Sequence, residues 1–225
     1  MPFQALATIP YFLKDQIRSL IIDGTFRPGQ PLREQDLEQR FGTSRSPIRE
    51  ALRLLELSGM VQHIQRKGFR VRHYSVTEIR HLYALYAELA AYGLRQIQSA
   101  PEIAQLETQL RELDEQLRQA HGAGDIDTYV ARLRDSYLAP SRLLGDQALL
   151  DTLSRLCAQL EPVHYLYLRT AMGSLAYDRF HGGILAALAQ ADTGAAAEAA
   201  RQGVLDMIQP AVSAQDAAAI EGEPG

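Results

Sequence analysis

The chain has 225 residues, enough for two domains, and its 46% hydrophobic and 22% charged residues are typical of a soluble globular protein. Its net charge of −4 is unevenly distributed along the chain. Residues 1–75 hold twelve basic and seven acidic side chains, whereas the remaining residues hold eleven basic and twenty acidic side chains. A single cysteine excludes a disulfide framework, and the lack of a membrane span or a signal peptide favours a cytoplasmic protein.

Two helical patterns, each ended by a glycine, open the chain. Apolar residues recur between Ile9 and Asp23 with the 3.6-residue period of an amphipathic helix, which Gly24 ends. The positions expected to face the core are Ile9, Phe12, Leu13, Ile17, Leu20 and Ile21. A second, shorter helix is expected over Glu34–Phe41, with Gly42 as its stop.

A third helix is predicted by the segment TSRSPIREALRLLELSG. Ser44 or Ser46 can cap it, and Gly59 closes it. Pro47 is tolerated because it falls in the first turn.

The pattern then changes from helical to alternating. VQHIQ and FRVRH alternate residue by residue on either side of Arg66-Lys67-Gly68, which predicts a β-hairpin whose turn uses a glycine at positive φ. Three helices followed by a hairpin, with a tight turn between the second and third helices, indicate a winged helix-turn-helix over residues 1–74.

From residue 75 onward only helical periodicity is found. Ser75-Val76-Thr77-Glu78 has capping-box spacing and opens a long helix that runs to about Gln98. Further helices are expected over 102–121, 126–143, 147–161, 163–172, 176–191 and 194–212. Pro101, Pro140 and Pro162 mark three of the breaks between them. The mostly α fold therefore continues as an antiparallel helical bundle over residues 75–213 that can host a ligand, followed by a disordered tail over 214–225.

The third helix carries the residue types needed to bind DNA. A recognition helix enters the major groove and presents donors from its first turns. Arg45 and Arg49 lie four residues apart on one face, and arginine forks match guanine edges as well as phosphates. Ser44 and Ser46 lie beside the helix N-terminus, where free N–H groups favour phosphate oxygens.

The expected hairpin adds a second basic element. Its tip, Arg66-Lys67-Gly68, is short and suits an approach to the DNA backbone or the minor groove. Arg33, Gln35 and Arg40, on or near the second helix, are further candidates for contacts across the backbone. Two arginines on one helix face are usually only a solvated surface. Their combination with a cap, a first-turn proline, a buried stripe and a basic hairpin favours DNA binding.

Residues 10–73, with the specific motif SRSPIREALRLLE, closely resemble the DNA-binding domain of the GntR family of bacterial regulators. Residues 76–212 are similar to the FCD effector domain of its FadR subfamily. The resemblance implies a homodimer that binds a pseudo-palindromic operator, usually as a repressor released by a metabolite. It places DNA contacts at Arg45, Ser46 and Arg49 and on the wing, and it puts Gln35 where some members have a base-reading arginine.

The resemblance also implies where a metal would bind, since many FCD domains hold one with an aspartate and three histidines. Asp135 and His181 match two of these positions, whereas Ala139 and Gly203 occupy the other two. One carboxylate and one imidazole are a poor site for zinc or nickel, so we expect no metal cofactor. His164 is a further histidine that could act as a metal ligand, although nothing in its spacing requires this role.

The effector pocket departs from the family as well. Where many members carry an arginine and a glutamate, this chain has Tyr86 and Ala90, which disfavours a simple carboxylate ligand. The candidate pocket residues are Tyr86, Asp135, Tyr137, His164 and His181. Tyrosines at helical spacing, which include Tyr83, Tyr165 and Tyr167, are more often core residues with a wet hydroxyl.

Three functions are compatible with these patterns. The expected one is a sequence-specific DNA-binding regulator, a repressor by resemblance, whose operator affinity depends on a small molecule in the helical domain. One alternative is a constitutive DNA-binding dimer whose effector pocket has decayed. The other is an enzyme that uses Asp135 and His181, disfavoured because the sequence lacks a nucleophile elbow, a Walker loop, a dinucleotide turn and a complete metal motif. No catalytic residue and no membrane partner is assigned.

Overall fold

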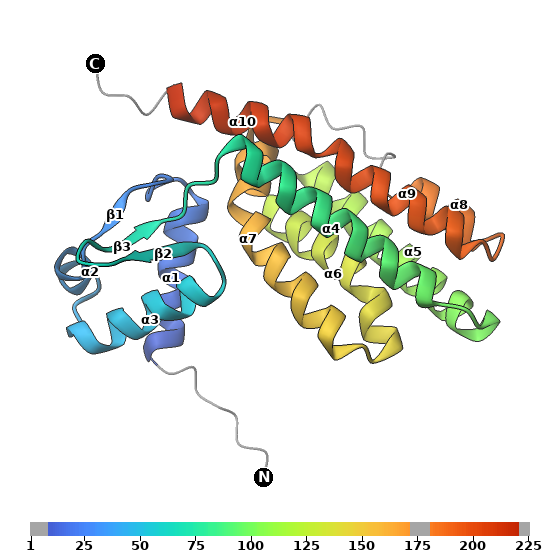
Figure 1. The fold of residues 1–225 in the computed structure, drawn as a ribbon, viewed down its shortest axis with the longest axis horizontal. Coiled ribbons are helices and arrows are strands. Elements are labelled where there is room, and N and C mark those ends of the chain that lie inside the picture. Colours follow the sequence, from blue (N-terminus) through green and yellow to red (C-terminus); the bar gives the residue numbers. More distant parts are fainter. Residues whose placement is uncertain (1–8, 172–180, 221–225) are drawn as a thin grey trace, which may run out of the picture. The chain divides into compact units, whose positions relative to one another are not determined.

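The computed structural model describes residues 9–171 and 181–220. The chain divides into two compact units, Met1–Tyr74 and Ser75–Gly225. The first unit contains helices and a small sheet, and the described part of the second contains only helices (Figure 1).

The first unit is a winged helix-turn-helix, as the sequence predicts. Its elements are α1 (Ile9–Ile22), β1 (Pro31–Leu32), α2 (Glu34–Phe41), α3 (Arg45–Leu57), β2 (Val61–Ile64) and β3 (Gly68–Val71). The strands pair antiparallel in the order β1-β3-β2. The sequence analysis missed β1 because two residues are too few to show alternation.

One face of each helix packs into the core of the first unit. Ile17 on α1 and Ile48 on α3 have no exposed surface. Two expectations for α1 are wrong, because Ile9 and Phe12 are 63% and 57% exposed. The buried stripe of α1 begins one turn after Ile9, at Leu13.

The second unit is an all-helical bundle in its described part. Its helices are α4 (Val76–Gln96), α5 (Ala100–Ala123), α6 (Ile126–Leu144), α7 (Gln147–Ala171), α8 (Gly182–Leu188), α9 (Thr193–Asp206) and α10 (Ile208–Ile220). Helix α4 contacts α6, α7 and α9, and α5 contacts α6 and α8. Helix α4 thus contacts helices from several parts of the unit, and Figure 1 shows it in front of α5 and α6.

Of the three breaks expected at prolines, the one at Pro101 is confirmed, because α4 ends at Gln96 and α5 begins at Ala100, and the other two are wrong. Pro162 lies inside α7, so the two helices expected on either side of it are one, and Pro140 lies inside α6. A proline in a helix interior costs about 3 kcal/mol. Both helices bury long faces in the bundle, and this packing offsets the local cost.

The C-terminal part of the second unit also differs from the expectation. The helix expected over 194–212 is divided into α9 and α10 at Met207. Helix α10 continues to Ile220, whereas a disordered tail was expected from residue 214. The beginning of the helix expected over 176–191 falls at 176–180, outside the described residues, and α8 begins at Gly182.

Serine caps define where the first two helices of the bundle begin. The expected capping box is present at α4, where the Glu78 amide donates to Ser75 Oγ at 3.2 Å and the Ser75 amide donates to Glu78 Oε2 at 2.9 Å. A second box, missed in the sequence analysis, pairs Ser99 with Glu102 at α5. Pro101 lies in the first turn of α5, where its missing N–H is tolerated.

Candidate nucleic-acid interface and ligand cavity

The beginning of α3 presents the polar side chains expected to contact DNA. Ser44 is the N-cap residue in extended backbone (φ −85°, ψ 167°), and its side chain makes no capping hydrogen bond. Ser44, Arg45, Ser46 and Arg49 are exposed, whereas Ile48 is fully buried. The helix therefore separates a core face from a polar face that can enter a groove.

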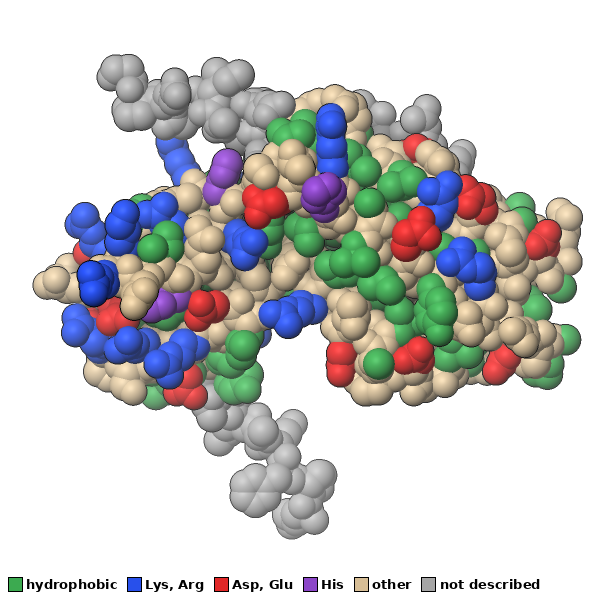
Figure 2. All heavy atoms as spheres, in the orientation of Figure 1, with side chains coloured by type: hydrophobic (Ala, Val, Ile, Leu, Met, Phe, Trp, Pro, Cys, Tyr) green, Lys and Arg blue, Asp and Glu red, His purple; other side chains and the backbone are tan. Residues whose placement is uncertain are grey.

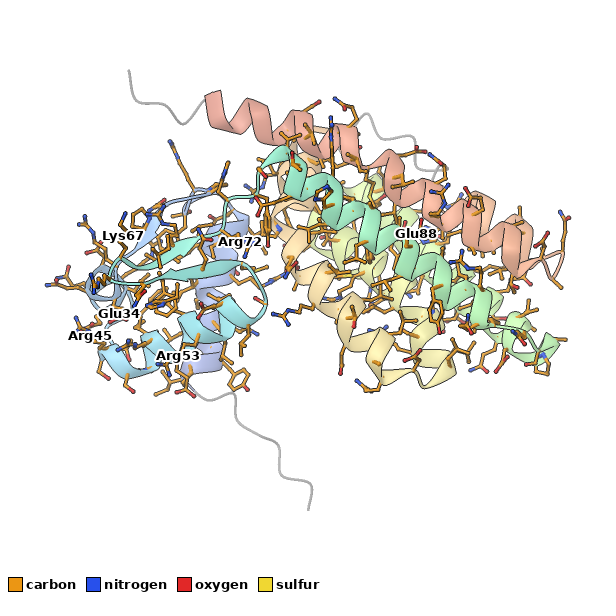
Figure 3. The ribbon with its side chains drawn as sticks, in the orientation of Figure 1. Glu34, Arg45, Arg53, Lys67, Arg72 and Glu88 are labelled. Atoms are coloured by element: carbon orange, nitrogen blue, oxygen red, sulfur yellow. The ribbon has the colours of Figure 1, made fainter. Side chains whose placement is uncertain are left out.

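Helix α2 holds both arginines of α3. Arg45 Nε lies 3.1 Å from Glu34 Oε2 and 3.2 Å from Glu38 Oε1, and Arg49 Nε lies 3.7 Å from Glu34 Oε1. Figure 3 shows Glu34 beside Arg45. Ion pairs this exposed add little stability, but they restrict the directions in which the guanidinium groups point. The sequence analysis did not identify Glu34 and Glu38, although acidic residues four apart in a basic domain are a usable signal.

The wing tip lies at the same end of the first unit as Arg45 (Figure 3). Ile64 pairs with Gly68 across the hairpin, and the Lys67 amide donates to the Ile64 carbonyl at 2.9 Å. Gly68 has a φ of 78°, as expected, and Arg66 also has a left-handed φ, of 65°. Arg66 and Lys67 are exposed. Figure 2 shows the Lys and Arg side chains that gather over this unit.

The remaining DNA candidates lie near α2. Arg33 is the N-cap residue of α2 and Gln35 is in its first turn, and both are exposed. The Arg40 guanidinium lies over the Phe26 ring, 5.6 Å from its centre, so this arginine has a structural role within the unit.

The five residues predicted for an effector pocket do not all line one cavity, although the Tyr86 and Tyr137 rings pack edge to face with their centres 5.2 Å apart. Tyr86 and His164 line a cavity of about 250 Å³ among α4, α6 and α7. Tyr137 and His181 line a separate cavity of about 10 Å³ formed by residues of α4, α5, α6, α8 and α9. Asp135 does not line either cavity.

The positions that the resemblance assigns to a metal do not form a donor set. The Asp135 carboxylate is paired with Arg132 at 3.0 Å and with Arg142 at 3.1 Å. His181 Nδ1 lies 3.8 Å from Asp114 Oδ1, and the pKa of His181 is lowered because burial disfavours its charged form. In residues 9–171 and 181–220, no group of three or more His, Cys, Asp or Glu side chains could hold a metal ion. These positions therefore present one carboxylate that is already paired with two arginines and one buried imidazole.

Burial favours the uncharged form of several groups in and beside the larger cavity. Burial raises the pKa of Tyr83, Tyr86 and Tyr137 well above the usual 10, raises that of Cys157 to about 11 and lowers that of His164 to about 4. Cys157 Sγ donates to Tyr86 Oη at 3.4 Å. Tyr83 Oη, Tyr137 Oη and His164 Nε2 have no hydrogen-bond partner within the described part of the chain.

Comparison with known sequence families identifies both units. Residues 12–71 match the bacterial regulatory proteins of the gntR family, and residues 78–206 match the FCD domain. The chain belongs to the GntR family. The combination with an FCD domain is consistent with its FadR-like subfamily.

Curated relatives of this GntR protein are regulators. YdhC of Bacillus subtilis (strain 168), an HTH-type transcriptional regulator, is 32% identical over 130 residues, which are 57% of this chain and 58% of YdhC. The HTH-type transcriptional repressor RspR of Escherichia coli (strain K12) is 34% identical over 64 residues, 28% of each chain. The chain thus spans between a quarter and three fifths of the length of these relatives.

Solved structures share the fold of the GntR protein. A transcriptional regulator GntR from Rhodococcus sp. RHA1 has a TM-score of 0.69 and 20% identity, covering 91% of this chain and 97% of that one. E. coli McbR/YncC has a TM-score of 0.57 and 22% identity, covering 94% and 99%. None of the helices in the described ranges is both long and apolar enough to span a membrane.

Proposed function

We propose that this GntR protein is a sequence-specific, operator-binding transcriptional regulator that acts as a homodimer and changes its DNA affinity when a small molecule binds the helical unit. The observation that carries the proposal is the exposed polar face of α3 with Arg45 and Arg49, since Arg45 lies at the same end of the unit as Lys67 of the basic wing (Figure 3). The repressor RspR, related over 64 residues, supports repression as the direction of control.

In the proposed complex α3 enters the major groove. The Arg45 and Arg49 forks contact guanine O6 and N7, while Ser44 and Ser46 bind phosphate at the helix N-terminus. Arg66 and Lys67 meet the backbone beside it, which adds affinity by counterion release. Because the operator is chromosomal DNA, the site of action is the cytoplasm.

Helix α4 offers a face for the second copy. Leu85 and Tyr92 lie seven residues apart on one side of α4 and are 50% and 43% exposed. Large apolar side chains that stay exposed favour association, and a dimer places two α3 helices on half-sites about one helical turn apart.

The proposed sensing step uses no metal and no catalysis. Asp135 is neutralised by two arginines, and His181 has a carboxylate rather than a second imidazole beside it. A ligand that binds one arrangement of the dimer better than another shifts the population towards it, and this shift changes the match to the operator.

The experiment that tests the proposal measures operator binding by Arg45→Ala and Arg49→Ala. The operator is first selected from random DNA with the parent protein. Each variant should bind it roughly 5–150-fold more weakly, equivalent to about 1–3 kcal/mol. Arg155→Ala, at an exposed arginine of α7, is the control with the same loss of charge and should bind normally. Parent-like binding by both α3 variants would refute the assignment.

A further inference from the structure

We propose that the cavity among α4, α6 and α7 is the effector site and takes an uncharged phenol, whose hydroxyl bonds to His164 and whose ring packs against Tyr86. This inference rests on the proposed function and deepens it, because it names the class of effector and the residues that recognise it. The proposed ligand is held by neither a metal nor an arginine.

The position of the cavity separates it from the metal positions that the resemblance implies. Among the described residues, its walls come from α4, α6 and α7. Asp135, Ala139, His181 and Gly203 do not line it. The cavity beside His181 has about 10 Å³, close to the smallest space that holds one water, so it has no room for an effector.

The size and apolar walls of the larger cavity suit a single substituted ring. A cavity of about 150 Å³ is known to take up benzene. At about 250 Å³, this one leaves room for a ring with a hydroxyl and a second small substituent. Val130, Leu133 and Leu138 supply apolar wall, and the buried Tyr86 ring supplies an aromatic surface against which a second ring can pack edge to face.

A buried imidazole gives the cavity one hydrogen-bonding position. His164 is only 8% exposed, and its Nε2 has no hydrogen-bond partner among the described residues. The Tyr83 ring packs edge to face on the imidazole, with the two centres 5.5 Å apart, and this contact restricts how the imidazole can turn. A buried polar atom without a partner is unfavourable, so a ligand group that bonds to Nε2 removes a penalty present in the empty protein.

The uncharged state of this imidazole favours a hydroxyl over other polar groups. Burial lowers the pKa of His164 to about 4, so the ring is neutral at neutral pH. Nε2 of a neutral imidazole is either an acceptor or a donor, according to the tautomer. A phenol hydroxyl both donates and accepts and therefore matches either tautomer, whereas a carboxylate can only accept and an ammonium group can only donate.

The charges of the lining disfavour an ion of either sign. Glu161 lines the cavity at 8% exposure, and its carboxylate opposes an anion. Arg134 and Arg142 also line the cavity, but both are exposed, so water screens their attraction for an anion, and Arg142 is bonded to Asp135 at 3.1 Å. A cation gains little from Glu161, which already has an interaction partner within the protein. Because any ion also loses hydration on burial, an uncharged ring fits this lining best.

The test is a calorimetric titration of the full chain, without DNA, with three compounds that differ in one group. They are 4-methylphenol, 1,4-dimethylbenzene, which lacks the hydroxyl, and 4-hydroxybenzoate, which has a carboxylate in place of the methyl group. We expect 4-methylphenol to bind at least roughly fivefold more tightly than 1,4-dimethylbenzene and at least roughly tenfold more tightly than 4-hydroxybenzoate. No binding of 4-methylphenol, or a smaller preference over either other compound, would overturn the inference.

A variant of His164 tests the hydrogen bond. His164→Phe keeps an aromatic ring but removes Nε2, so the preference for 4-methylphenol over 1,4-dimethylbenzene should disappear. His81→Phe, at an exposed position of α4, makes the same replacement outside the cavity and should keep the parent preference. A parent-like preference in His164→Phe would refute the assignment of the hydroxyl to this imidazole.

A cavity-filling variant locates the site. Ala158→Leu places extra carbon in the existing space, so the variant should melt no lower than the parent and lose 4-methylphenol binding. Unchanged binding by this variant would place the ligand elsewhere and refute the proposed site. His164→Phe and Ala158→Leu should bind the ligand-free operator normally, so failure here is separable from failure of the Arg45 and Arg49 experiment.

Discussion

At the level of single residues, Glu34 contacts both of the α3 arginines that we propose to bind DNA. It lies 3.1 Å from Arg45 and 3.7 Å from Arg49, so one carboxylate restrains two guanidinium groups. A side chain held before binding loses less entropy when it contacts a base, and restraint of this kind favours specificity more than total affinity.

Replacing Glu34 should therefore separate specificity from affinity. Glu34→Gln removes a negative charge near DNA, so binding to random DNA should rise, while the ratio of operator to random affinity should fall several-fold. Both affinities are measured by fluorescence anisotropy at one salt concentration. Glu50→Gln, at an exposed position of α3, removes the same charge and should leave the ratio unchanged. If both variants changed the ratio equally, orientation by Glu34 would have no role.

His164 makes the stability of the helical unit depend on pH. Burial lowers its pKa from 6.5 to about 4, so the unfolded chain takes up a proton below pH 6.5 while the folded chain does not until about pH 4. Stability is thus fully present above pH 6.5 and falls as the pH falls. The loss at about pH 5 should be on the order of 1–2 kcal/mol, and His181 acts in the same direction.

Urea unfolding as a function of pH checks this dependence. The free energy of unfolding of His164→Phe should fall less steeply than that of the parent between neutral pH and about pH 5. His81→Gln, at an exposed position of α4, should retain the parent slope. A parent-like slope in His164→Phe would show that His164 is not the titrating group.

At the level of secondary structure, the capping box of Ser75 stabilises the helix on which the bundle is built. Ser75→Ala removes the acceptor for the Glu78 amide and should lower the free energy of unfolding by about 0.5–2 kcal/mol. Denaturant unfolding followed by circular dichroism measures the change. Thr77→Ala, exposed in the same turn, should change stability by less than about 0.5 kcal/mol. Equal effects at the two positions would argue against the cap.

Local chemistry explains which elements the sequence predicts correctly. Gly42 ends α2 in the left-handed conformation, and Ser75 begins α4, because each depends on atoms within a few residues. Pro162 was misleading because its local cost is overridden by packing from helices distant in the sequence. The two-residue strand β1 exists only because β3, far along the chain, pairs with it.

The same distinction applies to the candidate site. The exposure of Arg45 and Arg49 could be predicted because the outer face of α3 follows from the helical period, whereas their contact with DNA stays a prediction. Their partner Glu34 depends on how α2 crosses α3. The cavity forms where α4, α6 and α7 meet, and its lining residues Tyr86 and His164 are far apart in the sequence. No pattern in the sequence specifies the volume that remains among the three helices.

At the level of the whole molecule, the dimer should depend on the exposed apolar face of α4. Leu85→Asp places a charge where two copies are proposed to meet, so sedimentation velocity should show a monomer. Its affinity for the full palindrome should fall towards that for a half-site. Leu57→Asp, at a residue of the first unit that is 67% exposed, is the control and should remain dimeric. A dimeric Leu85→Asp would move the interface to another surface.

Cys157 lines the proposed ligand cavity and is the only cysteine in the chain. Burial raises its pKa to about 11, so at neutral pH the thiol reacts slowly and only with reagents that enter the cavity. A bound ligand would compete with such a reagent for the same space. The protein thus carries a natural single-site chemical reporter, and the rate of alkylation of one sulfur would measure occupancy of the effector site in an unmodified chain.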